Sequence, residues 1–67
     1  MPVFHVPDMS CQHCVQSITR AIQAADAQAQ VSADLAQHRI TVSNSQLDAA
    51  ALHAIIAQAG YTPSTLA

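Results

Sequence analysis

Apolar and polar residues follow two different periods along the chain, and each change of period marks a predicted boundary between elements. Residues 3–6 alternate as a half-buried strand does, with Phe4 and Val6 on one face and His5 on the other. From residue 11 to residue 25 the apolar residues recur at spacings of three and four, which is typical of an amphipathic helix. The residues of its apolar face are Val15, Ile18, Ile22 and Ala25. The chain is therefore predicted to start with a strand and a helix.

After this helix the sequence returns to strand-like alternation. Val31, Ala33 and Leu35 alternate with polar residues and predict a second strand. Residues 39–42 predict a third strand, and the polar pair at 37–38 predicts the turn between the two. The middle of the chain should therefore form a hairpin.

The last part of the chain is predicted to hold a second helix and a short strand. Ser45 and Asp48 resemble a capping box at the start of this helix, and Gly60 is suited to the left-handed residue that ends it. Its apolar residues are Leu47, Leu52, Ile55, Ile56 and Ala59. Residues 61–64 predict the final strand.

Ser10 is the predicted N-cap of the first helix, the one that starts near residue 11.

The predicted order is strand, helix, strand, strand, helix, strand. This order is that of the ferredoxin-like fold, an α+β sandwich with two helices on one face of a four-stranded antiparallel sheet. With 67 residues, the chain is expected to be a single domain over residues 1–67. In this fold the loop before the first helix and the loop after the second lie at the same edge. Cys11, Cys14 and Tyr61 should therefore be neighbours.

Composition excludes some functions. The net charge is −2, and Arg20 and Arg39 are the two basic residues, which argues against nucleic-acid binding. No apolar run approaches the roughly 20 residues that span a bilayer, and the start lacks the pattern of a signal peptide. We therefore expect a cytoplasmic protein that does not insert into a membrane.

Both cysteines lie in one short stretch, residues 9–14, which reads Met-Ser-Cys-Gln-His-Cys. This stretch falls where the first strand gives way to the first helix, and the start of a helix favours thiolate over thiol. Structural zinc normally takes four protein ligands, so one such pair does not predict a closed zinc site. Thiolates also select Cu(I), which two sulfurs can hold with a position left open. Cys11 and Cys14 are thus predicted to bind a soft metal that can be passed on.

The neighbours of the cysteines allow more than one role. Met9 is either a third ligand or, as we favour, an apolar anchor that packs the loop on the core. His13 is either a solvent-exposed residue or an additional ligand, above all in a dimer or with zinc. Tyr61 either fills the core or hydrogen-bonds a sulfur, and Ser10 is placed near the ion without binding it. The other histidines are predicted to be ordinary surface residues: His5, His38 and His53.

The chain resembles the heavy-metal-associated domain family, and most closely its free-standing bacterial copper chaperones. Met9, Cys11 and Cys14 match the family motif M-x-C-x-x-C at the end of the first strand. A histidine before the second cysteine, here His13, is common in bacterial members, and the Ala-Gly-Tyr ending at 59–61 also matches. The resemblance covers essentially the whole chain.

This resemblance implies Cu(I) held by Cys11 and Cys14 and delivered to the metal-binding domains of a copper-exporting P-type ATPase. It implies a carrier and not an enzyme, and exposed dithiolate sites could also share copper in a homodimer. Asp8 departs from the family pattern, because the family usually has glycine there, and the chain has no lysine for a basic docking face.

Other functions remain open from the sequence. A dithiol redox protein also uses C-x-x-C at the start of a helix. Related carriers transport Hg(II) or Zn(II), Ag(I) also binds thiolates, and the same domain occurs within the ATPases themselves.

Overall fold

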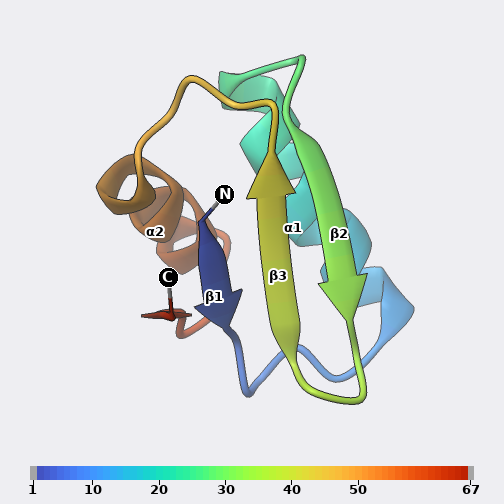
Figure 1. Ribbon diagram of the computed structural model, residues 1–67. Coiled ribbons are helices and arrows are strands. Elements are labelled where there is room, and N and C mark those ends of the chain that lie inside the picture. The colour runs from blue at the N-terminus through green and yellow to red at the C-terminus, as the bar shows by residue number, and fades with distance from the viewer. Residues whose placement is uncertain (1, 67) are drawn as a thin grey trace.

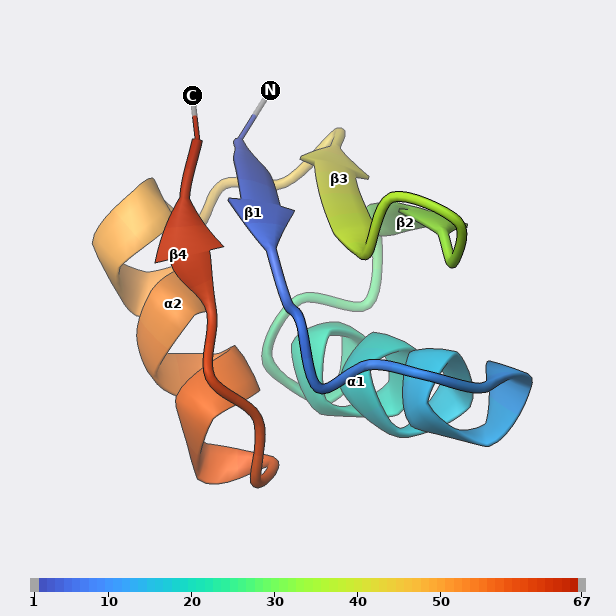
Figure 2. The ribbon, with the colours of Figure 1, turned by 90° about the horizontal axis from the view of Figure 1, so that it is seen from below.

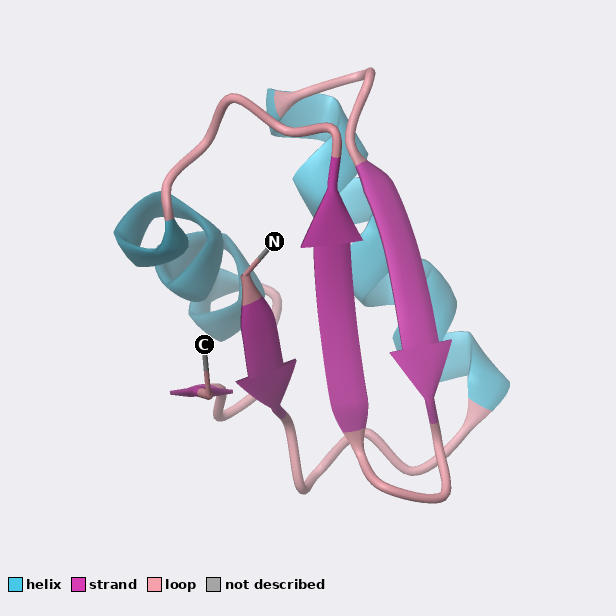
Figure 3. Ribbon diagram, in the orientation of Figure 1, coloured by secondary structure: helices cyan, strands magenta, loops and turns pink. Residues whose placement is uncertain are grey.

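The computed structural model describes residues 2–66 and shows a sheet covered on one face by two helices (Figures 1 and 2). The elements are β1 (Val3–His5), α1 (Gln12–Ala25), β2 (Gln30–Asp34), β3 (Arg39–Ser43), α2 (Ala49–Gln58) and β4 (Ser64–Thr65). The strands lie in the order β2-β3-β1-β4, and every neighbouring pair is antiparallel. The predicted ferredoxin-like fold is confirmed, as the colouring by element makes plain (Figure 3).

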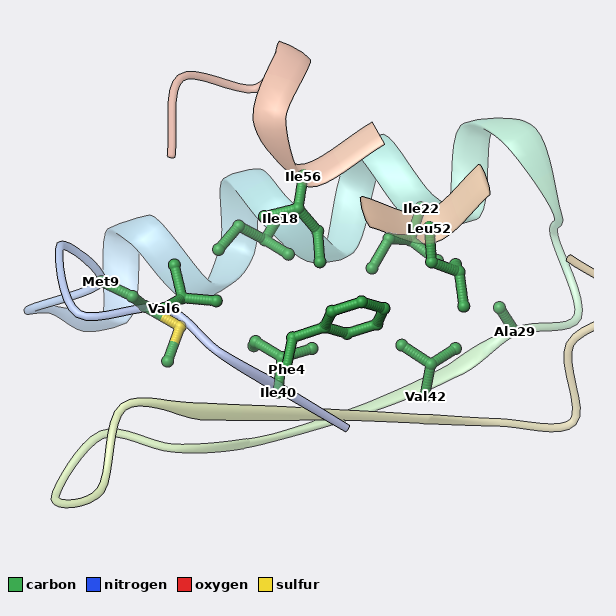
Figure 4. Packing of buried hydrophobic residues seen from close by; sticks show 10 residues of the cluster. All are labelled: Phe4, Val6, Met9, Ile18, Ile22, Ala29, Ile40, Val42, Leu52 and Ile56. Carbon is green, nitrogen blue, oxygen red and sulfur yellow. The ribbon is translucent and has the colours of Figure 1, made fainter. Parts of the chain in front are cut away.

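The hydrophobic core lies between the sheet and the helices, with Phe4 near its middle (Figure 4). Ten apolar residues form it: Phe4, Val6, Met9, Ile18, Ile22, Ala29, Ile40, Val42, Leu52 and Ile56. The predicted apolar faces supply most of the core, but Ala25 and Ala33 are exposed. Ala25 is the last residue of α1, and Ala29 in the loop that follows is buried instead.

The prediction that α2 begins at Ser45 was wrong: the Ser45 hydroxyl accepts the N–H of Leu47 at 3.1 Å, but α2 begins only at Ala49. Ser45 Oγ donates to Asp26 Oδ2 at 3.0 Å, and the same carboxylate oxygen accepts the backbone N–H of Gln46 at 2.9 Å. These bonds hold the segment as a loop and keep the pKa of Asp26 below its usual value. Asp48 is the N-cap, and its side chain accepts the N–H of Ala51 at 2.8 Å.

The last strand also lies later than predicted, at Ser64–Thr65 in place of 61–64. The N–H of Tyr61 is used in the helix end, where it donates to Ile56 O at 3.4 Å. Pro63 has no N–H to give to a sheet. Pairing with β1 therefore begins only after Pro63.

Within residues 2–66, neither helix combines the length and the apolar character needed to cross a membrane.

Gly60 ends α2 in the left-handed region, with φ of 102°, as the sequence predicts. Its N–H donates to Ala57 O at 3.1 Å, which together with the Tyr61 bond forms a Schellman motif. This end of the helix directs Tyr61 toward the loop between β1 and α1.

Replacing Gly60 tests this geometry. No atom lies within 4 Å of a Cβ at this position, so Gly60→Ala introduces backbone strain alone. We expect it to lower the free energy of unfolding by about 1–2 kcal/mol, measured by urea denaturation. Gly60→Asn should cost less, because asparagine visits the left-handed region more readily. Equal stability of the alanine variant and the wild type would contradict this account.

Candidate metal centre

Cys11 and Cys14 lie on the loop before α1 and in the first turn of that helix. Their sulfur atoms are 3.3 Å apart and form no disulfide. Cys11 is the N-cap in an extended conformation, and its carbonyl accepts the N–H groups of Cys14 at 3.1 Å and Val15 at 3.3 Å. Cys11 is exposed and Cys14 is partly exposed. One helical turn therefore brings two free thiols together at the surface.

The predicted N-cap role of Ser10 was wrong, since Cys11 occupies that position. The Cys11 side chain makes no capping hydrogen bond, so no side-chain oxygen of the N-cap satisfies the first N–H groups of α1. A helix end of this kind carries a partial positive charge and favours anions such as thiolate. Ser10 contributes through its backbone, which hydrogen-bonds Cys14 and helps to lower the pKa of that thiol.

Tyr61 has the largest effect on the thiol of Cys14. A hydrogen bond from the Tyr61 hydroxyl, followed by one from Cys11, lowers the pKa of Cys14 from 9.0 to about 7. The same contact with Cys14 raises the pKa of Tyr61 above 10.0. The fold thus brings Tyr61 beside the cysteine pair, as the topology predicts, and this contact favours the thiolate of Cys14.

Met9 anchors the loop between β1 and α1 on the core. Its side chain is fully buried in the core, while its N–H donates to Val6 O at 3.0 Å. Its carbonyl is 2.9 Å from Nδ1 of His38, in the turn between β2 and β3. This burial supports the interpretation of Met9 as an apolar anchor.

In the part of the chain from 2 to 66, no three histidine, cysteine or acidic side chains are grouped so that they could hold a metal. His13 is exposed on α1 and does not join the cysteines in such a group. A ligand role for His13 stays a prediction.

Some supporting residues could not be found from the sequence. His38 and His53, predicted as ordinary surface residues, are partly buried and hydrogen-bonded to Met9 O and Pro63 O. Met9 lies 29 residues from His38 and Pro63 lies 10 residues from His53, so no helical or strand spacing marks these bonds. Among these supporting residues, only Asp8 stands out in the sequence, because the family usually has glycine at this position.

Asp8 ties the metal-site loop to the segment after α2. Its Oδ1 accepts the N–H of Thr62 at 3.2 Å, and its Oδ2 lies 3.4 Å from the Thr62 hydroxyl. Thr62 follows Tyr61 directly. The Asp8–Thr62 bonds therefore hold the segment that carries Tyr61 next to the segment that carries the cysteines.

Fold and site together define a small domain that presents two free thiols at its surface. The model of the heavy-metal-associated domain matches residues 3–62, and the chain belongs to this family of metal-binding domains.

Three solved structures show the likeness. The copper chaperone Atx1 from Synechocystis PCC6803 is 35% identical, with a TM-score of 0.88 over 92% of this chain and 97% of that one. A gold binding protein is 30% identical, with a TM-score of 0.92 over 98% of this chain and all 100% of its own. The N-terminal domain of PacS from Synechocystis PCC6803 is 28% identical, with a TM-score of 0.73 over 98% and 96%. A search of the curated proteins found no match.

Tyr61→Phe tests the coupling between the tyrosine and the thiol. Without the hydroxyl, the pKa of Cys14 should rise from about 7 toward 9.0, which thiolate absorbance measures during a pH titration. The same titration of Cys14→Ser shows which part of the absorbance change comes from Cys14. An unchanged titration in Tyr61→Phe would contradict the assigned cause.

The same coupling makes the stability of the metal-free protein depend on pH. The pKa of Cys14 is about 7 when folded and 9.0 ordinarily, so the unfolded chain binds more protons between these values. Thermal stability should therefore rise with pH across this window. It should fall again as pH rises past 10.0, because folding raises the pKa of Tyr61. Cys14→Ser should remove the first rise; a rise that survives in this variant would contradict the assignment.

Asp8→Ala tests whether the bonds to Thr62 position Tyr61. Removing a nearby negative charge alone would lower the pKa of Cys14, whereas a displaced Tyr61 hydroxyl would raise it. We expect a rise of a fraction of a unit in Asp8→Ala. Asp8→Asn removes the charge but keeps an acceptor for the Thr62 N–H. The pKa of the Cys14 thiol should therefore not rise in this variant. A lowered pKa in both variants would show that Asp8 acts only through its charge.

Proposed function

We propose that this protein is a cytoplasmic Cu(I) chaperone that binds one ion through Cys11 and Cys14. It would deliver the ion to a metal-binding domain of a copper-exporting P-type ATPase by exchange of thiolate ligands. The observation that carries this proposal is the exposed pair of thiols with a sulfur–sulfur distance of 3.3 Å. Such a pair can hold a soft metal and leave it open to an incoming ligand.

The number and kind of donors favour Cu(I). A metal bound to two sulfurs at about 2.3 Å each separates them by roughly 3.8–4.6 Å, depending on the angle between the bonds. Starting from 3.3 Å, the sulfurs therefore need to separate by roughly 0.5–1.3 Å, which an exposed Cys11 at a helix start allows. Zn(II) would lack half of its usual four protein ligands, so it should bind more weakly. Ag(I) has similar demands to Cu(I) and should bind in vitro.

The unequal exposure of the two cysteines suggests an order for the transfer. An incoming thiolate of the acceptor adds to the open position of Cu(I), giving a three-sulfur intermediate that links the two proteins. The bond from Cys11 to copper then breaks, because Cys11 is exposed while Cys14 is partly covered and contacts Tyr61. A second acceptor thiolate replaces Cys14, and copper stays Cu(I) throughout.

Similarity to other domains supports a partner of the same fold. The chain resembles both a copper chaperone and the N-terminal domain of another protein, PacS. Two such domains can approach through their metal loops, and the same geometry would allow a copper-bridged homodimer. With no lysine in the chain, docking should rely on shape and polar contacts more than on a basic face.

A dithiol redox protein is the second candidate. The 3.3 Å sulfur–sulfur distance and the lowered pKa of Cys14 would also serve the formation of a disulfide. Membership in the heavy-metal-associated family favours the carrier over this alternative. A carrier of Hg(II) or Zn(II) would use the same two thiols.

Transfer to an acceptor tests the proposal directly. The Cu(I)-loaded protein is mixed with a metal-free N-terminal domain of a copper-exporting P-type ATPase, the two are separated, and the copper on each is measured. We expect copper to distribute between them within mixing time, much faster than it leaves for buffer alone. Cys11→Ser and Cys14→Ser should each hold copper too weakly to be loaded. Copper that stays on the wild-type chain in the presence of the acceptor would contradict the chaperone function.

A further inference from the structure

His5 and His38 form a second group of metal-binding side chains that the thiol site does not use. His5 lies at the end of β1 and His38 lies in the turn that precedes β3. Their ring centres are 6.3 Å apart and the rings are perpendicular. Pairing of His5 with Arg39, the residue after His38, brings the two together.

The hydrogen bond of His38 fixes which ring nitrogen is free. Nδ1 of His38 lies 2.9 Å from Met9 O. A carbonyl oxygen can only accept, so Nδ1 carries the proton and Nε2 of the neutral ring keeps its lone pair. Among residues 2–66, Nε2 has no hydrogen-bond partner and is not a buried unsatisfied atom. Histidines that bind metals are typically held in this way, by a bond from the other nitrogen to a carbonyl.

The backbone holds His38 in place as well. Its φ of 56° lies in the left-handed region, which is uncommon for a residue other than glycine. Its carbonyl accepts the N–H of Val6 at 2.7 Å. His38 is thus fixed at three points: by its strained backbone, by its carbonyl and by its ring.

We propose that His5 and His38 together bind a divalent ion of the type that prefers imidazole, Zn²⁺ or Cu²⁺, with water completing the coordination. Metal–nitrogen bonds of about 2.0–2.1 Å place the centres of two rings around one tetrahedral ion about 5 Å apart. The rings must approach by roughly 1 Å, which rotation of the partly exposed His5 side chain can supply.

Charge and donor number make this site weak. Arg39 is the cross-strand partner of His5 and opposes a cation, and no third histidine, cysteine or acidic residue joins the pair within residues 2–66. The site therefore differs from the thiol pair in its donors, its preferred ions and its affinity. It does not depend on the proposed function.

The experiment isolates the histidines by removing both thiols. In the double variant Cys11→Ser, Cys14→Ser, Zn²⁺ is titrated at mildly alkaline pH and followed by the NMR signals of the imidazole rings. We expect saturable binding of one ion per chain that shifts the signals of His5 and His38. Adding His5→Gln should weaken binding by about 10-fold or more.

His5→Gln is the main variant because no hydrogen bond of the His5 side chain holds the loop among the described residues. His38→Asn serves as the second, since asparagine tolerates a positive φ. Binding that shifts only His13 or His53, unchanged affinity in His5→Gln, or no saturable binding would overturn the proposal. None of these outcomes touches the chaperone function, because the protein under test lacks both cysteines.

Discussion

The chemistry of this domain depends on how the loop between β1 and α1 is held. Met9 is fully buried in the core, and His38 bonds its carbonyl from the turn between β2 and β3. On the other side, Asp8 bonds Thr62 after α2. The core and two segments that are remote in sequence thus fix a loop whose two thiols remain at the surface. The metal transfer proposed for this domain needs such a loop, anchored at its base and exposed at its tip.

Tyr61 links the end of one helix to the reactivity of the other. The left-handed Gly60 ends α2 and directs the chain back toward the start of α1. There the Tyr61 hydroxyl lowers the pKa of Cys14 to about 7. Thiolate is the form that binds metal, so this contact prepares the site at neutral pH without adding a ligand. The partial positive charge at the N-terminus of α1 also favours the thiolate of Cys14.

Much of the fold could be predicted from the sequence because its signals are local. The spacing of Ile18 and Ile22, the alternation around Phe4 and Val6, and Gly60 each report on their own element. The strand order then follows from the order of elements, and with it the approach of Tyr61 to Cys14. Boundaries failed for different reasons: the segment before α2 is bonded to the distant Asp26, whereas β4 starts late because Pro63 has no N–H to give to the sheet. The supporting bonds of His38 and Asp8 connect remote segments, so no local pattern could show them.

The central claim is that Cys11 and Cys14 together form a Cu(I) site that prefers this ion to zinc. The most direct measurement is a titration of the reduced protein with Cu(I) in competition with a chelator of known affinity, beside a titration with Zn(II). The account predicts tight binding of one Cu(I) per chain, much weaker binding of Zn(II), and loss of the tight binding in Cys14→Ser. Weak Cu(I) binding together with a disulfide between Cys11 and Cys14 that forms and reduces readily would contradict it.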